Sequence, residues 1–302
     1  MSKVRLLKIK RVLPAVLAVL FALLLSSCGA APDVEKSEIK NPERVVALTG
    51  GLADLWLLAG GNLAGAVEDT FSEYGIPEDG ITNIGGTHTF SLELILAINP
   101  DLVLASPDIP AHVKAEGVLA EAGIEVRNFK VESFPEYYET LGAFTELTGR
   151  PDLMVEYGDR VKEKIDGIVN GVSGVSPKVL LIRSSSAGVN ARNSETMTGA
   201  MLKDLGVTNI ADAGPLSDGL SIEEIIRQDP DFIFAVTMGD EEKAKEILNA
   251  TLYEDPAWSN LSAVKGGRFI MLPKELFHLK PNKRWAESYL IMKEMLYGGQ
   301  GA

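Results

Sequence analysis

The residues best suited to chemistry in this chain are arginines and a histidine near the ends of apolar segments. Arg183 directly follows the apolar run at residues 179–182. An arginine at the end of a buried strand can hold an anionic oxygen through a forked pair of donors. Arg192 is a weaker case of the same placement, and a surface ion pair is the alternative for Arg183. His278 lies in residues 277–285, where basic and aromatic side chains gather and would suit an acidic chelate.

The histidines allow a second interpretation, a site for a bare zinc or manganese ion. The chain has three histidines: His88 and His278 fall in segments expected to border a ligand site, and His112 begins a predicted helix after Pro110. No histidine-rich segment is present, and so few histidines need no special explanation. A zinc- or manganese-binding protein of a metal importer therefore stays the alternative function. We expect no resident metal and no cofactor.

Sequence signatures of catalysis are missing. The chain has no Gly-x-Ser-x-Gly nucleophile elbow, no Gly-x-x-x-x-Gly-Lys phosphate loop and no His-Glu-x-x-His pair. Gly50-Gly51 follows a predicted strand, but the Gly-x-Gly-x-x-Gly spacing of a dinucleotide site is absent. We therefore predict a binding protein, not an enzyme.

The elements that position these residues alternate between strand-like and helix-like runs. This alternation predicts βαβ units and mainly parallel sheets. A long helix with apolar residues at helical spacing is predicted from Pro151 to about residue 169. Strands are predicted before this helix at residues 44–49, 63–67, 102–105 and 124–129, and after it at 179–182, 232–236 and 269–272.

An internal repeat indicates two similar halves. Residues 91–104 match residues 221–234 without a gap, at an offset of 130. Each copy has a serine that can cap a helix, then an apolar helix, a Pro-Asp pair and a buried strand. The predicted fold class is therefore α/β, with two Rossmann-like lobes of mainly parallel sheets joined by a long rigid helix.

The first 28 residues have the three zones of a secretion signal. Five basic residues and no acidic one precede residue 12, an apolar run follows to residue 25, and Ser26-Ser27-Cys28 ends the segment. The apolar run is short for a spanning helix, which needs about 20 residues. Residues 25–28 resemble the lipobox of bacterial lipoproteins, which implies cleavage before Cys28 and lipid on its thiol. Because Cys28 is the only cysteine, an intramolecular disulfide is impossible.

Charge excludes two classes of partner. Removal of residues 1–27 takes away five of the 29 Lys and Arg and none of the 42 Asp and Glu, which leaves a net charge of −18. Such a chain does not suit nucleic acid, which calls for basic patches, or adsorption to anionic lipid. We expect the lipid on Cys28 to hold the protein at the outer face of the plasma membrane.

Five motifs occur in order along the chain, at residues 41–47, 91–103, 201–206, 209–212 and 221–231. Together they make the chain resemble the class III periplasmic binding proteins, which serve ABC importers of ferric siderophores, haem and cobalamin. The resemblance implies an extracytoplasmic monomer that captures an iron chelate or corrinoid between two lobes and delivers it to a permease dimer with its cytoplasmic ATPase. A ferric siderophore is the first choice of ligand.

The resemblance places the ligand over the carboxyl ends of the strands, where open α/β sheets bind ligands on physical grounds as well. The candidate ligand-binding residues are Thr49, Gly50, Asp69, Thr87, His88, Arg183, Arg192, Thr237, Met238, Phe277 and His278. A haem would need an axial donor, for which His88, His278 and Met238 are available. Trp285 is expected in the core of the final helix.

The resemblance also implies that one acidic residue on each lobe docks onto the permease. Glu93 and Glu223 occupy those positions. Helix electrostatics gives an alternative, since a glutamate in the first turn is favoured without any partner, and duplication of a lobe could have carried it along. The predicted organisation is a signal peptide at 1–27, a tether at 28–42, an N-terminal lobe at 43–150, a connecting helix at 151–170 and a C-terminal lobe at 171–302.

Overall fold

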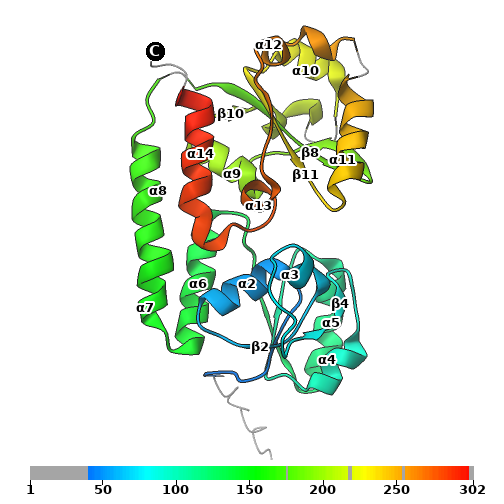
Figure 1. The fold of residues 1–302 in the computed structure, drawn as a ribbon, viewed down its shortest axis with the longest axis vertical. Helices are drawn as coiled ribbons and strands as arrows, with labels where there is room; N and C mark the ends of the chain where they lie inside the picture. Colours follow the sequence, from blue (N-terminus) through cyan, green and yellow to red (C-terminus); the bar gives the residue numbers. More distant parts are fainter. Residues whose placement is uncertain (1–39, 175, 217–219, 254–255, 299–302) are drawn as a thin grey trace, which may run out of the picture. The chain divides into compact units, whose positions relative to one another are not determined.

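The structure, a computed structural model, describes residues 40–174, 176–216, 220–253 and 256–298. Cys28, the predicted signal peptide and most of the predicted tether lie outside these residues. From Lys40 onward the chain forms one compact unit (Figure 1). Within the described ranges, no helix has both the length and the apolar composition needed to cross a membrane.

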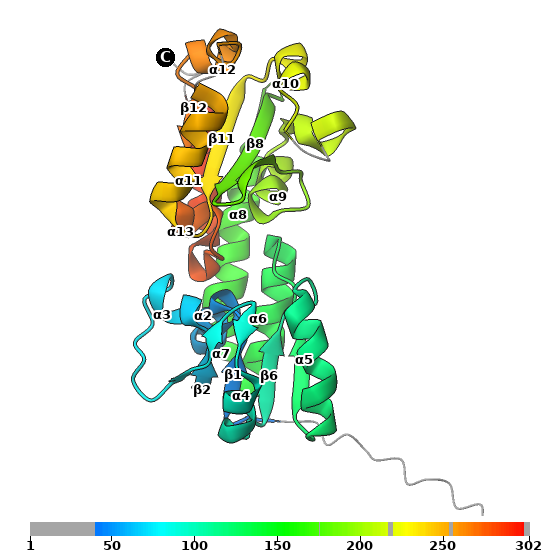
Figure 2. The ribbon, with the colours of Figure 1, turned by 90° about the vertical axis from the view of Figure 1, so that its right-hand side faces the viewer.

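Five parallel strands form the first sheet, in the order β3-β2-β1-β6-β7. Its central strands are buried along their whole length, as in sheets covered on both faces. Helices α2 and α6 share a core with one face, and α4 and α5 with the other (Figure 2). The strands are β1 (Val45–Ala47), β2 (Leu63–Ala66), β3 (Thr82–Asn83), β6 (Leu102–Ala105) and β7 (Glu125–Asn128). The helices are α2 (Gly50–Leu58), α3 (Glu68–Ser72), α4 (Leu92–Ile98), α5 (Pro110–Glu121) and α6 (Phe134–Thr148); a hairpin of β4 (Gly85–Gly86) and β5 (Thr89–Phe90) precedes α4.

The second sheet has the order β10-β8-β11-β12, all parallel, and β9 adds to β8 in the antiparallel sense. Helices α9 and α14 share a core with one face, and α10, α11 and α12 with the other. The strands are β8 (Lys178–Ser185), β9 (Gly188–Ala191), β10 (Thr208–Asn209), β11 (Phe232–Thr237) and β12 (Phe269–Met271). The helices are α9 (Met197–Asp204), α10 (Ile222–Gln228), α11 (Glu241–Leu248), α12 (Ser262–Lys265), α13 (Lys274–Phe277) and α14 (Trp285–Tyr297).

Two predicted strand ends are corrected by the structure. Strand β8 continues beyond residue 182 because β9 folds back and pairs with it, so Arg183 lies within the strand. Gly50 and Gly51 do not form a turn after β1; they begin helix α2, and the Thr49 hydroxyl caps it by accepting a bond from the Leu52 amide. Arg183 still lies near the carboxyl end of β8, and Gly50 and Gly51 follow shortly after the carboxyl end of β1.

The sequence repeat is also a repeat of structure. Ser91 and Ser221 cap α4 and α10 by accepting bonds from amides three residues later. Both helices end on a left-handed residue, Asn99 with φ 49° and Asp229 with φ 41°, and these residue types tolerate that region. The aspartate that follows then binds the neighbouring strand: Asp101 accepts from the Arg44 amide, and Asp231 from the Lys178 amide.

The connecting helix links the first half of the chain to the second, but it is less regular than predicted. It consists of α7 (Pro151–Met154), a π-helical turn (Val155–Asp159) and α8 (Arg160–Asn170). Helix α7 packs against α6, and α8 packs against α14 (Figure 1). Val161 and Ile165 of α8 enter an apolar core that includes residues of both sheets. The two sheets therefore share one continuous core behind their facing strand ends.

Trp285 belongs to this shared core, as expected. Its side chain is fully buried and its ring contacts Phe134 and Tyr137 of α6, with centroids 6.0 and 5.9 Å away. Tyr289 and Met292, one and two turns further along α14, are buried too. This aromatic contact joins the start of α6 to the start of α14.

Candidate functional site

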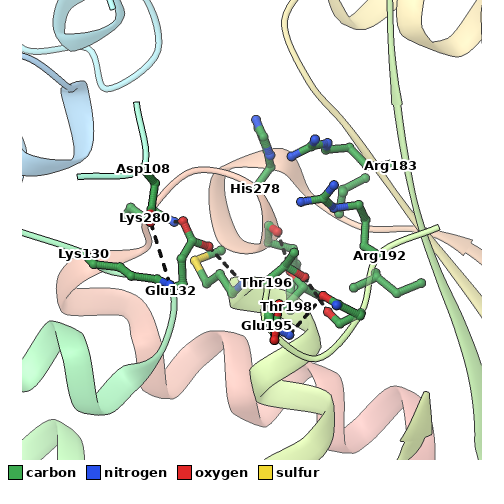
Figure 3. Close-up of a pocket in the computed structure, with 15 residues that line it drawn as sticks. Asp108, Lys130, Glu132, Arg183, Arg192, Glu195, Thr196, Thr198, His278 and Lys280 are labelled. Atoms are coloured by element: carbon green, nitrogen blue, oxygen red, sulfur yellow. Dashed lines mark hydrogen bonds and ion pairs between the residues drawn. The ribbon is translucent and has the colours of Figure 1, made fainter. Parts of the chain in front are cut away.

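Two adjacent cavities lie where the strand ends of the two sheets face each other. The first, which we call the basic cavity, has a volume of about 340 Å³ and is lined by Arg183, Arg192, Lys130 and Lys280 among others (Figure 3). The second, the loop cavity, has about 230 Å³ and is lined by the loops after β1, β6 and β7. Both cavities share Asp108, Glu132, His278 and Lys280. They are two compartments of one cleft.

Arg183 and Arg192 give the basic cavity its charge. Both guanidinium groups project into it from the β8–β9 hairpin (Figure 3). Within the described ranges neither side chain has a hydrogen bond or an ion pair, and Nε of Arg192 is buried without a partner. Burial and the neighbouring charge of Arg192 lower the pKa of Arg183. Two guanidinium groups that share one cavity and make no direct ion pair among the described residues are costly unless an anion joins them.

The opposite wall of the basic cavity carries a carboxylate and an ammonium that are already paired. Lys280 Nζ lies 2.7 Å from Glu132 Oε1. The other Glu132 oxygen accepts a hydrogen bond from the Met197 amide at the start of α9, at 3.2 Å. Glu132 follows β7 of the first sheet, while α9 and Lys280 belong to the second half of the chain. This side chain therefore crosses the cleft.

His278 lies between the two cavities and lines both. Burial, followed by the charges of Arg183, Lys280, Lys274 and Arg192, lowers the pKa of His278 to about 4. The imidazole is therefore neutral at neutral pH. Phe277, the residue before it, is buried; its carbonyl accepts a bond from the Thr198 hydroxyl of α9.

The loop cavity brings together Thr49 and Gly50, which follow β1, and Asp69, which follows β2. Gly50 has to be small, because a Cβ there would meet the Tyr74 ring at 2.7 Å. The Tyr74 hydroxyl accepts a hydrogen bond from the Lys280 amide at 2.9 Å, and burial raises the pKa of this phenol. The first half of the chain thus contacts the segment after α13 across this cavity.

A second ion pair joins the two halves beside the cleft. Lys274 Nζ lies 2.6 and 2.8 Å from the two Glu73 oxygens and 3.1 Å from the Gly239 carbonyl oxygen. The Lys274 side chain is only 14% exposed, so solvent screens this pair less than a surface pair. It helps to set the spacing of the loops that border the cleft.

Four of the predicted ligand residues line neither cavity. Thr87 donates its hydroxyl proton to Asp69 at 2.6 Å, and His88 is exposed in the β4–β5 turn. Thr237 is buried within β11, and Met238 follows it. Of the predicted set, the structure brings together Arg183, Arg192, Phe277 and His278 in the basic cavity, and Thr49, Gly50, Asp69 and His278 in the loop cavity.

His112 has a structural role that its sequence position did not reveal. It is fully buried, its Nδ1 accepts from the Ser106 amide at 3.0 Å, and its Nε2 contacts the Thr87 carbonyl at 3.0 Å. Burial is the main cause that lowers the pKa of this imidazole. It fixes the loop after β6 to the β4–β5 hairpin. Across the described residues, no group of three His, Cys, Asp or Glu side chains could hold a metal ion.

A model of the periplasmic binding protein family matches residues 45–276. The chain belongs to this family. It is a class III binding protein, the substrate-binding component of an ABC importer, and acts outside the cytoplasm with a permease and an ATPase as partners.

Two relatives from Bacillus subtilis (strain 168) are similar to this binding protein. YhfQ, named as an ABC transporter substrate-binding lipoprotein, is 24% identical over 287 residues, which cover 87% of each chain. The Fe(3+)-citrate-binding protein YfmC is 24% identical over 195 residues, 62% of this chain and 58% of that one. An ABC transporter substrate-binding protein from Listeria monocytogenes EGD-e has a crystal structure with a TM-score of 0.71 at 19% identity, covering 86% of this chain and 100% of that one. This likeness confirms the fold.

Glu93 and Glu223 lie away from the cleft, at equivalent places on this binding protein. Each is exposed in the first turn of its helix, α4 or α10. Bonds from its own backbone amide and from the Ser91 hydroxyl lower the pKa of Glu93. An exposed apolar residue lies three positions later in both helices: Leu96 is 40% exposed and Ile226 is 44% exposed.

The sequence did not single out Lys130, Glu132 or Glu195, which line the basic cavity. Lys130 and Glu132 follow β7 within four residues, so the strand-end rule that selected Arg183 would have selected them too. No such rule selects Glu195. It follows β9, which pairs with β8 in the antiparallel sense, and the rule for parallel strands does not apply to the end of such a strand.

The depressed pKa of His278 predicts an acid-sensitive fold. The unfolded chain binds a proton at this side chain near pH 6.5, whereas the folded chain resists it until about pH 4. Stability from this residue is therefore present at neutral pH and is lost as the pH falls from 6.5 to 4, by at most about 3 kcal/mol. We expect urea unfolding at pH 7, 6 and 5 to show a steeper loss for the wild type than for His278→Gln. Parallel pH curves for the two proteins would contradict this account.

Proposed function

We propose that this protein is the lipid-anchored capture component of an iron importer. It binds a ferric siderophore rich in carboxylate groups outside the cytoplasm and, as a monomer, delivers it to the permease. The proposal includes no catalytic step: the protein binds its ligand and releases it unchanged.

The observation that carries the proposal is the pair of Arg183 and Arg192, neither of which makes an ion pair among the described residues. Each guanidinium can form two parallel hydrogen bonds with a carboxylate, and such charge-assisted bonds are about twice as strong as neutral ones. The other basic residues of the cavity have carboxylates nearby: Lys280 pairs with Glu132, and Lys130 lies 3.9 Å from Asp108. The carboxylates of a polycarboxylate chelate can therefore pair with the two arginines on the wall formed by β8 and β9.

The relatives support an iron ligand of this chemistry. YfmC is named for binding Fe(3+)-citrate, whose carboxylates match a pair of arginines. YhfQ is named a lipoprotein, in agreement with the lipobox-like residues 25–28 of this chain. The proposal keeps the organisation expected from the sequence: a signal at 1–27, a tether at 28–42, lobes at 43–150 and 171–302, and a connecting helix at 151–170.

Haem is a second candidate ligand because His278 offers a neutral imidazole to the cleft. A neutral ring nitrogen can serve as an axial iron ligand, and the two arginines would suit the propionates. The other donors expected from the sequence, His88 and Met238, line neither cavity. A haem would thus depend on His278 alone among the predicted donors.

We also propose that Glu93 and Glu223 dock onto basic residues of the permease. Their placement on repeated helices gives two equivalent acidic contacts, as a permease dimer would require. Leu96 and Ile226 extend each contact with an apolar residue one turn further along the same helix face. A glutamate favoured only by the helix dipole would need no such exposed apolar neighbour.

The arginine pair should decide the affinity for an anionic chelate. We expect Arg183→Gln and Arg192→Gln each to weaken ferric citrate binding by about 10- to 100-fold, the range for loss of a charge-assisted hydrogen bond. Isothermal titration calorimetry against ferric citrate, a neutral ferric trihydroxamate, haemin and cyanocobalamin measures this. The matched control is Arg160→Gln on α8, which should bind like the wild type. If the wild type binds none of the four compounds, the proposed function is wrong.

The two glutamates should matter for transport and not for capture. Charge reversal at Glu93 or Glu223 places like charges against the permease, so we expect affinity for the reconstituted importer to fall at least about tenfold. Ligand affinity of the free protein should stay unchanged. Glu163→Arg on α8 serves as the control for charge reversal elsewhere. Equal loss with the control variant would show that only net charge matters.

Lipid attachment at Cys28 predicts a defined mass for the protein extracted from membranes. Intact-mass spectrometry should give the mass of residues 28–302 plus the lipid, with the modification on the N-terminal cysteine. The mass of the full 302-residue chain, or of a mature chain with a free thiol, would contradict the anchor.

A further inference from the structure

Among the carboxylates that line the basic cavity, Glu132 makes the shortest contact with a basic side chain. Its Oε1 contacts Lys280 Nζ at 2.7 Å, and its Oε2 accepts the Met197 amide at 3.2 Å. Its charge also acts favourably on Arg183, although no ion pair joins the two. The Glu132 side chain thus uses one cation of the cleft and weakens the attraction of another for a ligand.

The contacts of the Glu132 carboxylate are not what holds its own backbone in place. Its backbone is fixed separately, because the Glu132 amide donates to Glu136 Oε2 at 2.6 Å and Ser133 caps α6. The Lys280–Glu132 pair is partly solvated, with side chains 23% and 35% exposed. Such pairs contribute little, up to about 1 kcal/mol. A chelate with several carboxylates can therefore replace Glu132 on Lys280.

We propose that Glu132 acts as an internal competitor that determines ligand specificity: it occupies Lys280 in the empty cleft, and only an anionic ligand displaces it. Arg183 and Arg192 supply the first attraction, and Lys280 becomes the third basic contact once Glu132 swings away. A neutral chelate gains nothing from Lys280 and leaves the pair intact. The inference rests on the proposed function, since it concerns the same ligand.

Two other carboxylates line the basic cavity but lack this role. Glu195 is exposed at the cavity rim and, within the described ranges, has no basic partner. Asp108 is 57% exposed and lies 3.9 Å from Lys130. Both repel an anion through solvent, and neither holds a cation that the ligand needs. Glu195 is therefore the matched control for charge alone.

The test is the change in affinity for two probes, ferric citrate and a neutral ferric trihydroxamate, measured by calorimetry. Glu132→Gln removes the charge and keeps one oxygen, which can accept from the Met197 amide or from Lys280 but not from both in the present geometry. We expect about fivefold tighter binding of ferric citrate, the size of the lost ion pair, and no change for the neutral chelate. Glu195→Gln should change ferric citrate binding by less than about twofold.

A double-mutant cycle with Lys280 separates competition from simple repulsion. In the Lys280→Met background, Glu132→Gln should lose most of its gain and behave like Glu195→Gln. A gain that persists without Lys280, or an equal gain from Glu195→Gln, overturns the inference. So does weaker ferric citrate binding by Glu132→Gln, which would make Glu132 a ligand contact or a structural residue.

Thermal unfolding of each variant shows which proteins are folded. If Lys280→Met does not fold, the ratio of affinities for the two probes in Glu132→Gln decides alone: an unchanged ratio overturns the inference. Different results would refute the proposed function and the inference about Glu132. A wild type that binds neither probe, haemin nor cyanocobalamin removes the proposed function, whereas a wild type that binds ferric citrate with an unchanged Glu132→Gln removes only the inference.

Discussion

The continuous apolar core behind the cleft is the constraint on which the ligand site depends. A cavity between two sheets keeps its dimensions only if the sheets cannot slide, and here Val161 and Ile165 of α8 pack with Tyr289 and Met292 of α14 in one core. Polar anchors reinforce it: the Tyr289 hydroxyl donates to Asp204 at 2.6 Å. Cores packed at crystal-like density resist deformation. The strand ends that carry the two arginines and Glu132 therefore face each other at a nearly fixed distance.

Charge in the cleft works against the charge of the whole molecule. Residues 28–302, the mature chain under the proposed function, carry a net −18, so their overall field repels an anionic chelate. That field is screened over about 8 Å at physiological ionic strength, whereas the cations lining the cavity act at hydrogen-bond distance and in lower dielectric. Under the proposed function, recognition of an anion is thus a local property of Arg183, Arg192 and Lys280. The acidic exterior instead suits contact with basic residues of a partner.

The sequence predicted those parts of the fold that depend on local chemistry. The capping serines, the Pro-Asp pairs and the apolar runs of the repeat act within a dozen residues of one another, and all lie as expected. Arg183 and His278 could be selected because each lies next to a recognisable element. The partner of Lys280 could not, since Glu132 is 148 residues away in the chain. The role of His112 was hidden for the same reason: the Thr87 carbonyl that it contacts comes from a hairpin 25 residues earlier.

The repeat also explains why Arg183 of the cleft comes from the second half of the chain and not from the first. Strand β1 pairs with β6 as β8 pairs with β11: Val45 lies opposite Leu102, and Val179 opposite Phe232, the repeat equivalent of Leu102. Counting four residues onward from Val45 and from Val179 makes Thr49 and Arg183 equivalent.

The two halves use this equivalent position differently. In the first half a helix follows the strand, and the Thr49 hydroxyl caps α2. In the second half β8 runs on and returns as β9, no helix needs a cap there, and the equivalent side chain is free to carry a charge. The scaffold therefore occurs twice, and the copy without a helix after its first strand is the one that places Arg183 in the cleft.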